Sequence, residues 1–217
     1  DGWNVVAVVS AMSKETNKLI DLAKQVGVEN LVDPEYDALI STGEDVSSSL
    51  LAIALNSIEI SSRSWRGWQL PIRTDSFHSN AKIEEIKTNQ IINSFKEGVK
   101  VAVVSGFQGI EQAGRITTLG RGGSDTSAVA IAAAIDAERC DIYTDVSGIY
   151  TTDPRIKRNA SKLKKISFEE MLEMASLGAN VLQTRAVELA MRHKVTIRVL
   201  NSFLKEEGTL VCDEEEI

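Results

Sequence analysis

The sequence contains few of the residues that hold small proteins together through covalent or metal bonds. Its 217 residues include 2 cysteines, 2 histidines and 3 prolines. Two cysteines make no disulfide framework, and no Cys/His spacing predicts a structural zinc site. The net charge of −7 disfavours nucleic acid as a partner, because phosphate backbones attract basic surfaces. No apolar run reaches the ~18 residues of a membrane span. We therefore expect a cytoplasmic protein with no membrane partner.

The sequence does contain short apolar segments that alternate with longer periodic ones. The segments typical of buried parallel strands are β-branched and apolar: Val5–Val9, Val99–Val104, Cys140–Thr144 and Val195–Leu200. Segments with a helical pattern of apolar residues are Glu15–Val26, Glu44–Ile58, Phe168–Ser176 and Val181–His193. Thr126–Ala137 is almost wholly Ala, Val and Ile, which predicts a buried helix. This alternation predicts a parallel sheet covered by helices on both faces. We expect short strands and loops in Ser61–Ala81 and a solvated tail in Asp213–Glu216.

The most informative segment is the glycine-rich turn Thr117–Thr126, which leads into a predicted helix. Glycines let backbone N–H groups approach an anion, and a helix start adds free donors and partial positive charge. Arg121 adds a planar fork suited to carboxylate or phosphate. Ser124 and Asp125 are good helix caps, so a capped turn before a core helix is the structural alternative. The turn is not a Walker P-loop, because no Lys-Ser/Thr follows its glycines.

Other polar loops follow the predicted strands, where parallel α/β sheets bind ligands. Ser10–Asn17 follows the first strand, and its hydroxyls either cap a helix or hold a substrate. Ser105–Gly109 follows the second, where a plain connection is the alternative. Thr144–Arg155 follows the third and mixes acids, hydroxyls, an aromatic residue and an arginine, which is unusual for a mere turn. In Ser41–Glu44, the acid Glu44 either favours the dipole of its helix or faces a ligand amine.

Taken in order, these strings resemble aspartate kinases, members of the amino acid kinase superfamily, from about Val5 to Thr209. The specific strings are Ser10–Met12, Ser41–Glu44, Gly106–Gly109, Thr117–Asp125 and Asp141–Asp145. The resemblance implies an α/β fold, a three-layer αβα sandwich on a mainly parallel sheet, with residues 1–217 as a single catalytic domain. It implies phosphoryl transfer from MgATP to the side-chain carboxylate of L-aspartate, the first step towards lysine, threonine and methionine. It also implies a homo-oligomer.

The resemblance assigns roles to residues at matching positions. Arg121 is implied to clamp a substrate carboxylate, and Asp125 to orient charged groups around the phosphates. The other implied contacts with aspartate are Ser10, Thr16, Glu44, Gly122, Gly123 and Ser124, with Glu44 as the partner of the amino group. The implied nucleotide contacts are Ser124, Thr144, Asp145, Tyr150, Thr151, Asp153, Arg155 and Asn180. No metal ligands are implied, because Mg²⁺ would be held mainly through the phosphates of ATP.

The chain departs from the family pattern at three places. The family begins with a strand that ends in a Lys-Phe-Gly-Gly turn at the ATP phosphates, and this chain starts after it. Asn180 follows Gly178 and Ala179, where the family usually has a lysine. The C-terminal ACT regulatory domains are absent. The first two departures remove positive charge from a site that brings two anions together, so we expect low activity from this chain alone.

Two alternatives remain open. The chain could be a nucleotide-binding, aspartate-binding or assembly module of the same fold with little turnover, which Asn180 favours. It could also be a sister kinase that acts on glutamate, acetylglutamate or UMP, although the strings Ser41–Glu44 and Gly120–Asp125 count against this. A panel of substrates separates the kinases, and nucleotide binding without turnover would identify the module.

Overall fold

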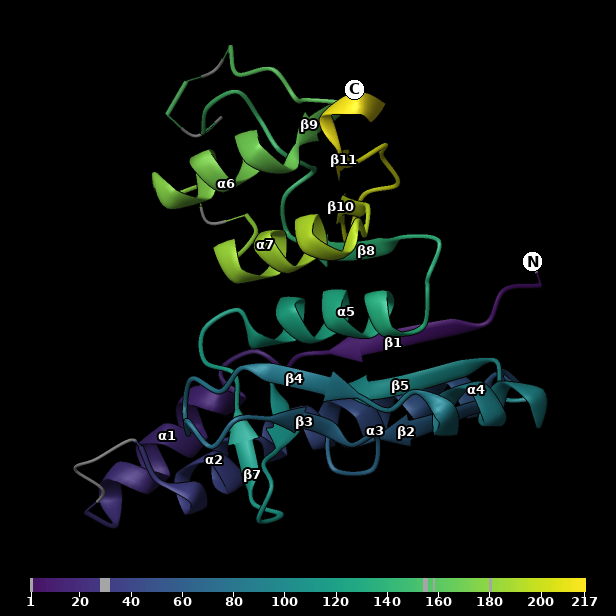
Figure 1. Cartoon of the computed structure of the whole chain (residues 1–217), viewed down its shortest axis with the longest axis vertical. Helices are drawn as coiled ribbons and strands as arrows, with labels where there is room; N and C mark the ends of the chain where they lie inside the picture. The colour runs from purple at the N-terminus through teal and green to yellow at the C-terminus, as the bar shows by residue number, and fades with distance from the viewer. Residues whose placement is uncertain (1, 28–31, 154–155, 158, 180) are drawn as a thin grey trace. The chain divides into compact units, whose positions relative to one another are not determined.

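The chain folds into two compact units, Asp1–Ala134 and Ile135–Ile217, in a computed structural model (Figure 1). The structure describes residues 2–27, 32–153, 156–157, 159–179 and 181–217. Helices alternate with strands in both units, and each unit contains parallel strand pairs. The predicted α/β class is therefore confirmed. We call the two parts unit 1 and unit 2 and describe each separately.

A parallel sheet lies in unit 1, with the strand order β1 (Val5–Val9), β5 (Val101–Ser105) and β2 (Ser62–Trp65). The central strand β5 is buried from Ala102 to Ser105, which explains its continuous apolar sequence. It begins two residues later than predicted, because Val99 N–H donates instead to the carbonyl of Ser94 in the preceding helical turn. The carboxyl ends of β1 and β5 lie next to each other.

The second sheet of unit 1 has the order β4 (Ile83–Ile86), β3 (Ile72–Thr74), β6 (Gln108–Ile110) and β7 (Ile116–Thr118). Its pairs are antiparallel except for β3 with β6. The short strands β2 and β3 confirm the prediction for Ser61–Ala81. The strands β4, β6 and β7 were not predicted, because three or four residues are too few to establish an alternating pattern.

Unit 1 contains the helices α1 (Glu15–Gln25), α2 (Pro34–Ile40), α3 (Thr42–Ser57), α4 (Asn89–Lys96) and α5 (Gly123–Ala134). The predictions of α1, α3 and α5 are confirmed, with ends displaced by up to three residues. The helix α3 packs against β1, β2 and β5, and α5 packs against β1, β4 and β6 (Figure 1). The unpredicted α2 has a proline in its first turn and the side chain of Asp33 as its cap, which accepts from Glu35 N–H at 2.6 Å.

By length and composition alone, one stretch among the described residues could cross a membrane, namely Pro34–Ser57. It comprises α2 and α3, which bury the charged side chains of Asp37 and Glu44 within the chain. Core helices of folded domains pass the same test. The stretch therefore carries no membrane assignment.

Unit 2 is built on a mixed sheet with the order β8 (Cys140–Thr144), β10 (Ile197–Asn201), β11 (Thr209–Cys212) and β9 (Lys165–Ser167). The pairs β8–β10 and β9–β11 are parallel, and β10–β11 is antiparallel. The helices α6 (Phe168–Ser176) and α7 (Thr184–His193) pack against each other (Figure 1). Both cysteines, Cys140 and Cys212, are buried free thiols in this sheet.

The limits of α6 agree with the prediction because a capping box fixes its start. The Ser167 hydroxyl accepts from Glu170 N–H, and the Glu170 carboxylate accepts from Ser167 N–H. The helix α7 starts three residues later than predicted, and β10 starts two residues later. The predicted tail is an exposed 3₁₀ turn at Glu214–Glu216.

Candidate functional site

The predicted site strings of unit 1 meet at the carboxyl ends of β1 and β5. Val9 and Ser105 are direct neighbours in these parallel strands, and Gly106 N–H donates to the Val9 carbonyl at 3.0 Å. A Cβ atom on Gly106 would lie 2.9 Å from Ser124 Oγ, so the turn after β5 touches the first turn of α5. The structure therefore places the loop after Ser10, the Gly106–Gly109 string and the glycine-rich turn at one edge of the sheet.

Glu44 joins the same edge from α3. Its Oε1 accepts a hydrogen bond from Ala11 N–H, in the loop after β1, at 3.0 Å. A Cβ atom on Gly43 would lie 2.9 Å from the Cβ of Ala11, so only glycine lets α3 approach this loop so closely. Glu44 thus does more than favour the helix dipole, because its side chain connects α3 to the loop after β1.

The Glu44 carboxyl group has unusual surroundings. It is 4% exposed, and its Oε2 has no hydrogen-bond partner among the described residues. Burial raises the pKa of Glu44 to about 7; the charge of Asp45 adds to the rise, and the N–H groups of Ala11 and Glu44 oppose it. A buried carboxylate with one open oxygen is costly unless a ligand supplies a donor or a cation. Such groups are candidates for functional sites.

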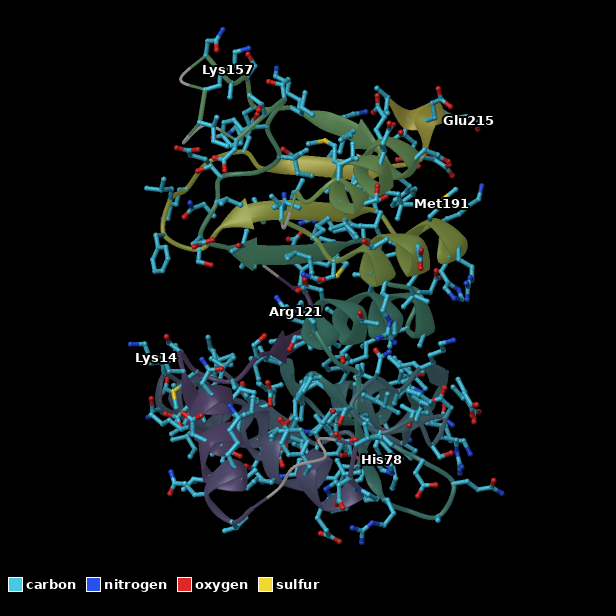
Figure 2. The ribbon with its side chains drawn as sticks, turned by 90° about the vertical axis from the view of Figure 1, so that its left-hand side faces the viewer. Lys14, His78, Arg121, Lys157, Met191 and Glu215 are labelled. Atoms are coloured by element: carbon cyan, nitrogen blue, oxygen red, sulfur yellow. The ribbon has the colours of Figure 1, made fainter. Side chains whose placement is uncertain are left out.

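The glycine-rich turn presents donors at the start of α5. Gly120 and Gly122 have φ of 75° and 69°, the left-handed region that favours glycine. The N–H groups of Ser124 and Asp125 lie in the first helical turn, where they have no acceptor within the helix. Arg121 is exposed in this turn (Figure 2). These are the donors that an anion requires.

Asp125 occupies the first turn of α5 as well. Burial raises the pKa of its carboxyl group above the ordinary value. An acid beside an anion site repels phosphates unless a proton or a cation accompanies them, so its surroundings suit a metal-bound nucleotide better than a bare one. In the part of the chain that the structure describes, no three His, Cys, Asp or Glu side chains are arranged to hold a metal ion themselves.

Ser10 and Thr16 flank the loop after β1. Ser10 is exposed directly after the strand, and Thr16 is half-buried in the first turn of α1. The N-cap of α1 is Lys14 with φ of 67°, and no side chain caps the helix. The helix-capping alternative for this loop is therefore wrong. Both hydroxyls remain candidates for substrate contacts.

In unit 2, the predicted nucleotide residues follow the carboxyl end of β8. Thr144 ends the strand, and its Oγ1 donates to Asp145 Oδ1 at 3.2 Å. Asn201 at the end of β10 donates to the Asp145 carbonyl and to Ser147 Oγ, both at 3.3 Å. The parallel pair β8–β10 thus holds the start of this loop, at the strand ends where α/β sheets bind ligands.

The rest of the loop forms a small antiparallel pairing. Tyr150 bridges to Lys162, while Thr151 N–H donates to the Ser161 carbonyl at 3.0 Å. The Asp153 carbonyl accepts from two N–H groups further along the chain. Thr144, Asp145, Tyr150, Thr151 and Asp153 therefore belong to one loop, as predicted. Of the other three predicted nucleotide residues, Ser124 lies in the first turn of α5 in unit 1, and Arg155 and Asn180 lie outside the described residues.

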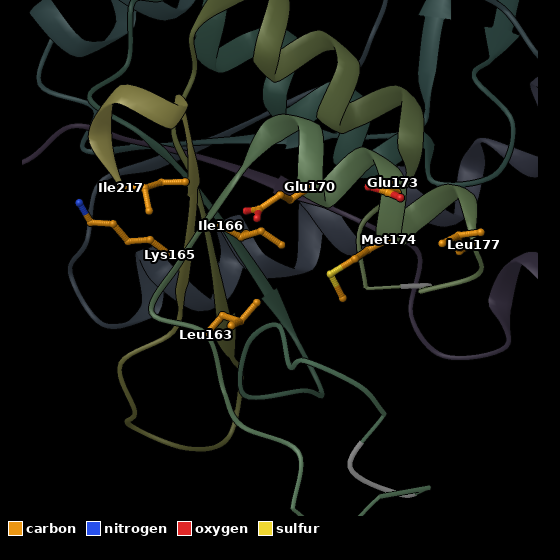
Figure 3. Close-up of a pocket in the computed structure, with 8 residues that line it drawn as sticks. All are labelled: Leu163, Lys165, Ile166, Glu170, Glu173, Met174, Leu177 and Ile217. Atoms are coloured by element: carbon orange, nitrogen blue, oxygen red, sulfur yellow. The ribbon is translucent and has the colours of Figure 1, made fainter.

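A pocket of about 420 Å³ elsewhere in unit 2 contains none of the predicted residues. It is lined by β9, α6 and the residues next to them, including Ile166, Met174 and Ile217 (Figure 3). Its walls are mostly apolar, with Lys165, Glu170 and Glu173 among the polar lining residues. The Glu170 carboxylate is already engaged in the cap of α6.

Two buried polar clusters in unit 1 were not predicted. Asp37 accepts hydrogen bonds from Thr118 N–H at 2.9 Å and from Ser79 N–H, and it pairs with His78 Nδ1 at 2.9 Å, which ties α2 to β7. The second cluster surrounds Asp45 and Gln108. Gln108 was recognisable from the sequence as part of the Gly106–Gly109 string, a turn that carries the family resemblance, but its side chain had no predicted role.

The family profile and the curated relatives that this chain matches agree with each other. Residues 1–201 match the sequence profile described as the amino acid kinase family. An aspartate kinase of Stutzerimonas stutzeri (strain A1501) is 56% identical over 216 residues, which are 99% of this chain and 52% of that protein. The chain spans about half the length of the curated relatives it matches.

Solved structures agree with the fold. The crystal structure of aspartate kinase from Synechocystis has a TM-score of 0.82 and 46% identity, and covers 96% of this chain and 34% of that one. Escherichia coli aspartokinase III in complex with aspartate and ADP has a TM-score of 0.79 and 35% identity, and covers 91% of this chain and 44% of that one. These similarities confirm the predicted αβα fold.

Proposed function

The chain belongs to the amino acid kinase family, and from this premise we propose that it is the catalytic domain of an aspartate kinase. In this proposal it transfers the terminal phosphoryl group of ATP to the side-chain carboxylate of L-aspartate. The observation that carries the proposal is the buried Glu44 carboxyl group, whose Oε2 has no partner among the described residues. Aspartate supplies an ammonium group, which matches this open oxygen in charge and in donors.

The other groups at the same sheet edge suit the anionic parts of the substrates. Arg121 offers a bidentate fork to a carboxylate of aspartate. Ser10 and Thr16 offer hydroxyls to its remaining polar atoms. The backbone around Gly122, Gly123 and Ser124 offers N–H groups to a carboxylate of aspartate, and Ser124 also to the phosphates, as helix starts commonly do for anions. The similarity to an aspartokinase solved in complex with aspartate and ADP supports aspartate and a nucleotide as the two ligands.

The nucleotide roles that we propose fall to the loop Thr144–Asp153 of unit 2, together with Ser124 and the sequence positions Arg155 and Asn180. Asp125 fits a nucleotide whose phosphates carry Mg²⁺, because a carboxylate beside the anion site would repel phosphates without a cation. When bound, that ion supplies charge neutralisation. The ion would be held through the phosphates rather than through a ligand set of the protein.

The reaction needs no general base, because the aspartate carboxylate is already a nucleophile. One of its oxygens forms a bond to the terminal phosphorus of ATP, the bond from that phosphorus to the bridging oxygen breaks, and ADP leaves with the electron pair. The product is an acyl phosphate, 4-phospho-L-aspartate. The protein contributes in-line positioning and positive charge, which phosphoryl transfer requires. Arg121 and the donors at the start of α5 supply that charge.

The test is a substrate panel on the purified chain with MgATP. With aspartate we expect aspartyl phosphate, which is trapped as the hydroxamate. With glutamate, acetylglutamate or UMP as the acceptor we expect no phosphorylated product. Asn180→Lys is expected to raise the rate, because it restores positive charge where the family has a lysine. Phosphorylation of another acceptor would overturn the substrate assignment. If calorimetry shows that the chain binds nucleotide and aspartate but no turnover is measured, the binding-module alternative is identified. Light scattering tests the expected homo-oligomer.

A further inference from the structure

We propose that Asp45 and Gln108 are positioning residues that fix the first turn of α3 and thereby hold Glu44 against the ammonium group of the substrate. This inference rests on the proposed function for the identity of the ligand. It concerns a buried polar cluster, consisting of Ser41, Asp45, Ser48, Ser105 and Gln108, that touches the site through α3. The function of this cluster is to set the position and the charge of Glu44.

Both the nitrogen and the oxygen of the Gln108 side-chain amide make hydrogen bonds. It is 1% exposed, its Nε2 donates to the Ser41 carbonyl and to Asp45 Oδ1, both at 3.1 Å, and its Oε1 accepts from Gly67 N–H at 3.2 Å. The Ser41 carbonyl lies directly before α3, and Asp45 lies in its first turn. One side chain from the start of β6 therefore holds the start of α3 through two hydrogen bonds.

Asp45 receives further donors from the same surroundings. Its Oδ1 accepts from Ser105 Oγ at 2.8 Å, and Ser105 Oγ is 2.9 Å from Ser48 Oγ one turn along α3. Arg66 Nε lies 3.5 Å from Asp45 Oδ2. The carboxylate thus joins α3 to the end of β5 and to the loop after β2. Several directional bonds leave the first turn of α3 little freedom to rotate or slide.

The backbone near Gln108 has an unusual conformation and close contacts that only glycine permits. Phe107 has φ of 66°, which is uncommon for a residue with a side chain. A Cβ atom on Gly67 would lie 3.0 Å from Gln108 Cγ, and one on Gly109 would lie 2.5 Å from Thr74 Cγ2. Gly67 therefore lets the loop after β2 approach Gln108, and Gly109 lets β6 approach β3 next to it.

The cluster acts on Glu44 in two ways. The geometry of α3 carries Glu44 to Ala11 N–H while its Oε2 stays open. The negative charge of Asp45 also stabilises the protonated form of Glu44, since Asp45 is the charged group that contributes to the raised pKa of Glu44. Arg66 pairs with Asp45 rather than with Glu44, so it moderates this effect. The cluster therefore fixes where Glu44 lies and adds, through Asp45, to the rise in the pKa of Glu44 that burial mainly causes.

The first experiment compares two Gln→Glu substitutions in the full chain. Gln108→Glu replaces the donor Nε2 by an oxygen that faces the Ser41 carbonyl and the Asp45 carboxylate. We expect the KM for aspartate to rise by about tenfold or more, with the KM for ATP changed by less than about twofold. Gln90→Glu, the same change at an exposed position of α4, is the matched control and leaves both constants unchanged. Equal effects of Gln108→Glu on both substrates would overturn the proposal.

The second experiment separates position from charge. Asp45→Asn keeps an acceptor oxygen for Ser105 and Gln108 but removes the charge. We expect its aspartate affinity at pH 8 to stay within about threefold of the wild type, and the pH at which Glu44 ionises to fall, as followed by carboxyl-carbon NMR. Asp45→Leu removes the acceptor and is expected to lose at least about tenfold in affinity. Equal affinities of the two variants, or an unchanged Glu44 titration in Asp45→Asn, would overturn the proposal.

The outcomes distinguish this inference from the proposed function. If the wild type neither binds nor phosphorylates aspartate, the proposed function fails, and the Glu44 titration in Asp45→Asn still tests the coupling between the two acids. If the wild type is active but the Gln108→Glu and Gln90→Glu variants behave alike, the positioning role fails and the function stands. Should Gln108→Glu not fold, Gln108→Met, which lacks donors and charge, takes its place with the same expected split between the two substrates.

Discussion

At the scale of single residues, the site combines groups that are costly for folding and useful for binding. Among the described residues, neither Oε2 of the buried Glu44 carboxyl group nor the Arg121 side chain in the glycine-rich turn has a partner. Neither arrangement stabilises the protein in the absence of a ligand. Each becomes favourable when an ammonium group and a carboxylate arrive together, as they do in an amino acid.

Arg121→Ala is predicted to lower aspartate affinity by about tenfold or more and to leave nucleotide affinity within about twofold. The reason is the loss of a charge-assisted pair with a substrate carboxylate, worth about 1.5–3 kcal/mol. Calorimetry with aspartate and with ADP measures both affinities. Exposed Arg192 on α7 provides the control, since Arg192→Ala is expected to change neither. Unchanged aspartate affinity in Arg121→Ala would contradict the assigned role.

Glu44→Gln is predicted to stabilise the ligand-free protein at pH 8. Burial raises the pKa of Glu44 from 4.5 to about 7, so between these values the folded state binds more protons than the unfolded state. Stability therefore falls as pH rises through this window, and above pH 7 the buried charge costs on the order of 2–3 kcal/mol. Glutamine avoids that cost. At pH 5 the wild type is already protonated, and the advantage of the variant shrinks.

Urea unfolding at pH 8 and at pH 5 measures this difference. The matched substitution Glu97→Gln on the surface is expected to show no dependence on pH. The same Glu44→Gln protein should require more aspartate, but not more ATP, for turnover. A Glu44→Gln variant that is less stable than the wild type at pH 8 would show that the carboxylate has a partner after all.

The residue scale also shows the limit of sequence analysis. Arg121, Asp125 and Glu44 were recognisable because they stand inside unusual strings beside glycines. The cluster of Asp45 and Gln108 was not recognised, because its members are separated by 63 positions and only the folded chain brings them within 3.1 Å. Asp37 was missed for the same reason, since its partners Ser79 and Thr118 lie far along the chain.

At the scale of elements, the start of α5 depends on the turn after β5. The two meet so closely that a Cβ atom on Gly106 would lie 2.9 Å from Ser124 Oγ and 3.1 Å from Ser124 Cα. Any side chain at position 106 must therefore displace the first turn of α5, which carries the donors of the anion site.

Gly106→Ala is predicted to destabilise the protein by about 1–3 kcal/mol and to weaken nucleotide binding, because overpacking displaces the helix backbone. Denaturant unfolding measures the stability. A double-mutant cycle with Ser124→Gly supplies the control, since removal of Cβ and Oγ relieves the two shortest contacts. The expected coupling is favourable by at least about 0.5 kcal/mol. Additive effects would mean that the two residues do not touch in solution.

Elements with a chemical start signal or a long pattern were predictable. The capping box fixes the start of α6, the length of α3 makes its apolar spacing clear, and the nearly continuous apolar sequence of α5 indicates a buried helix. The strands β6 and β7 have three residues each, and pairing rather than pattern creates them. The helix α2 has seven residues, too few for a reliable helical period, although Asp33 and Pro34 were usable signals of a helix start.

At the scale of the whole molecule, the proposed ligands map to different units of the chain. The aspartate contacts Ser10, Thr16, Glu44 and Arg121 belong to unit 1, whereas the loop Thr144–Asp153 belongs to unit 2. The nucleotide should therefore leave a footprint in unit 2 that aspartate alone does not.

Hydrogen exchange read by mass spectrometry is predicted to separate the two footprints. Saturating aspartate should slow exchange in peptides that contain Ala11 and Glu44, and ADP should slow exchange in peptides from Thr144 to Asp153. Protection arises because bound ligand holds local structure closed. Aspartate added to Arg121→Ala serves as the control and should give no protection. Protection of the Thr144–Asp153 peptides by aspartate alone would contradict the division of roles.

Both thiols, Cys140 in β8 and Cys212 in β11, lie buried in the sheet of unit 2, and unit 1 contains no cysteine. Burial also raises the pKa of the Cys212 thiol, which keeps it in the unreactive thiol form. Alkylating reagents can therefore react only after this sheet opens. The rate of thiol labelling therefore reports how often the sheet of unit 2 opens, independently of the state of unit 1.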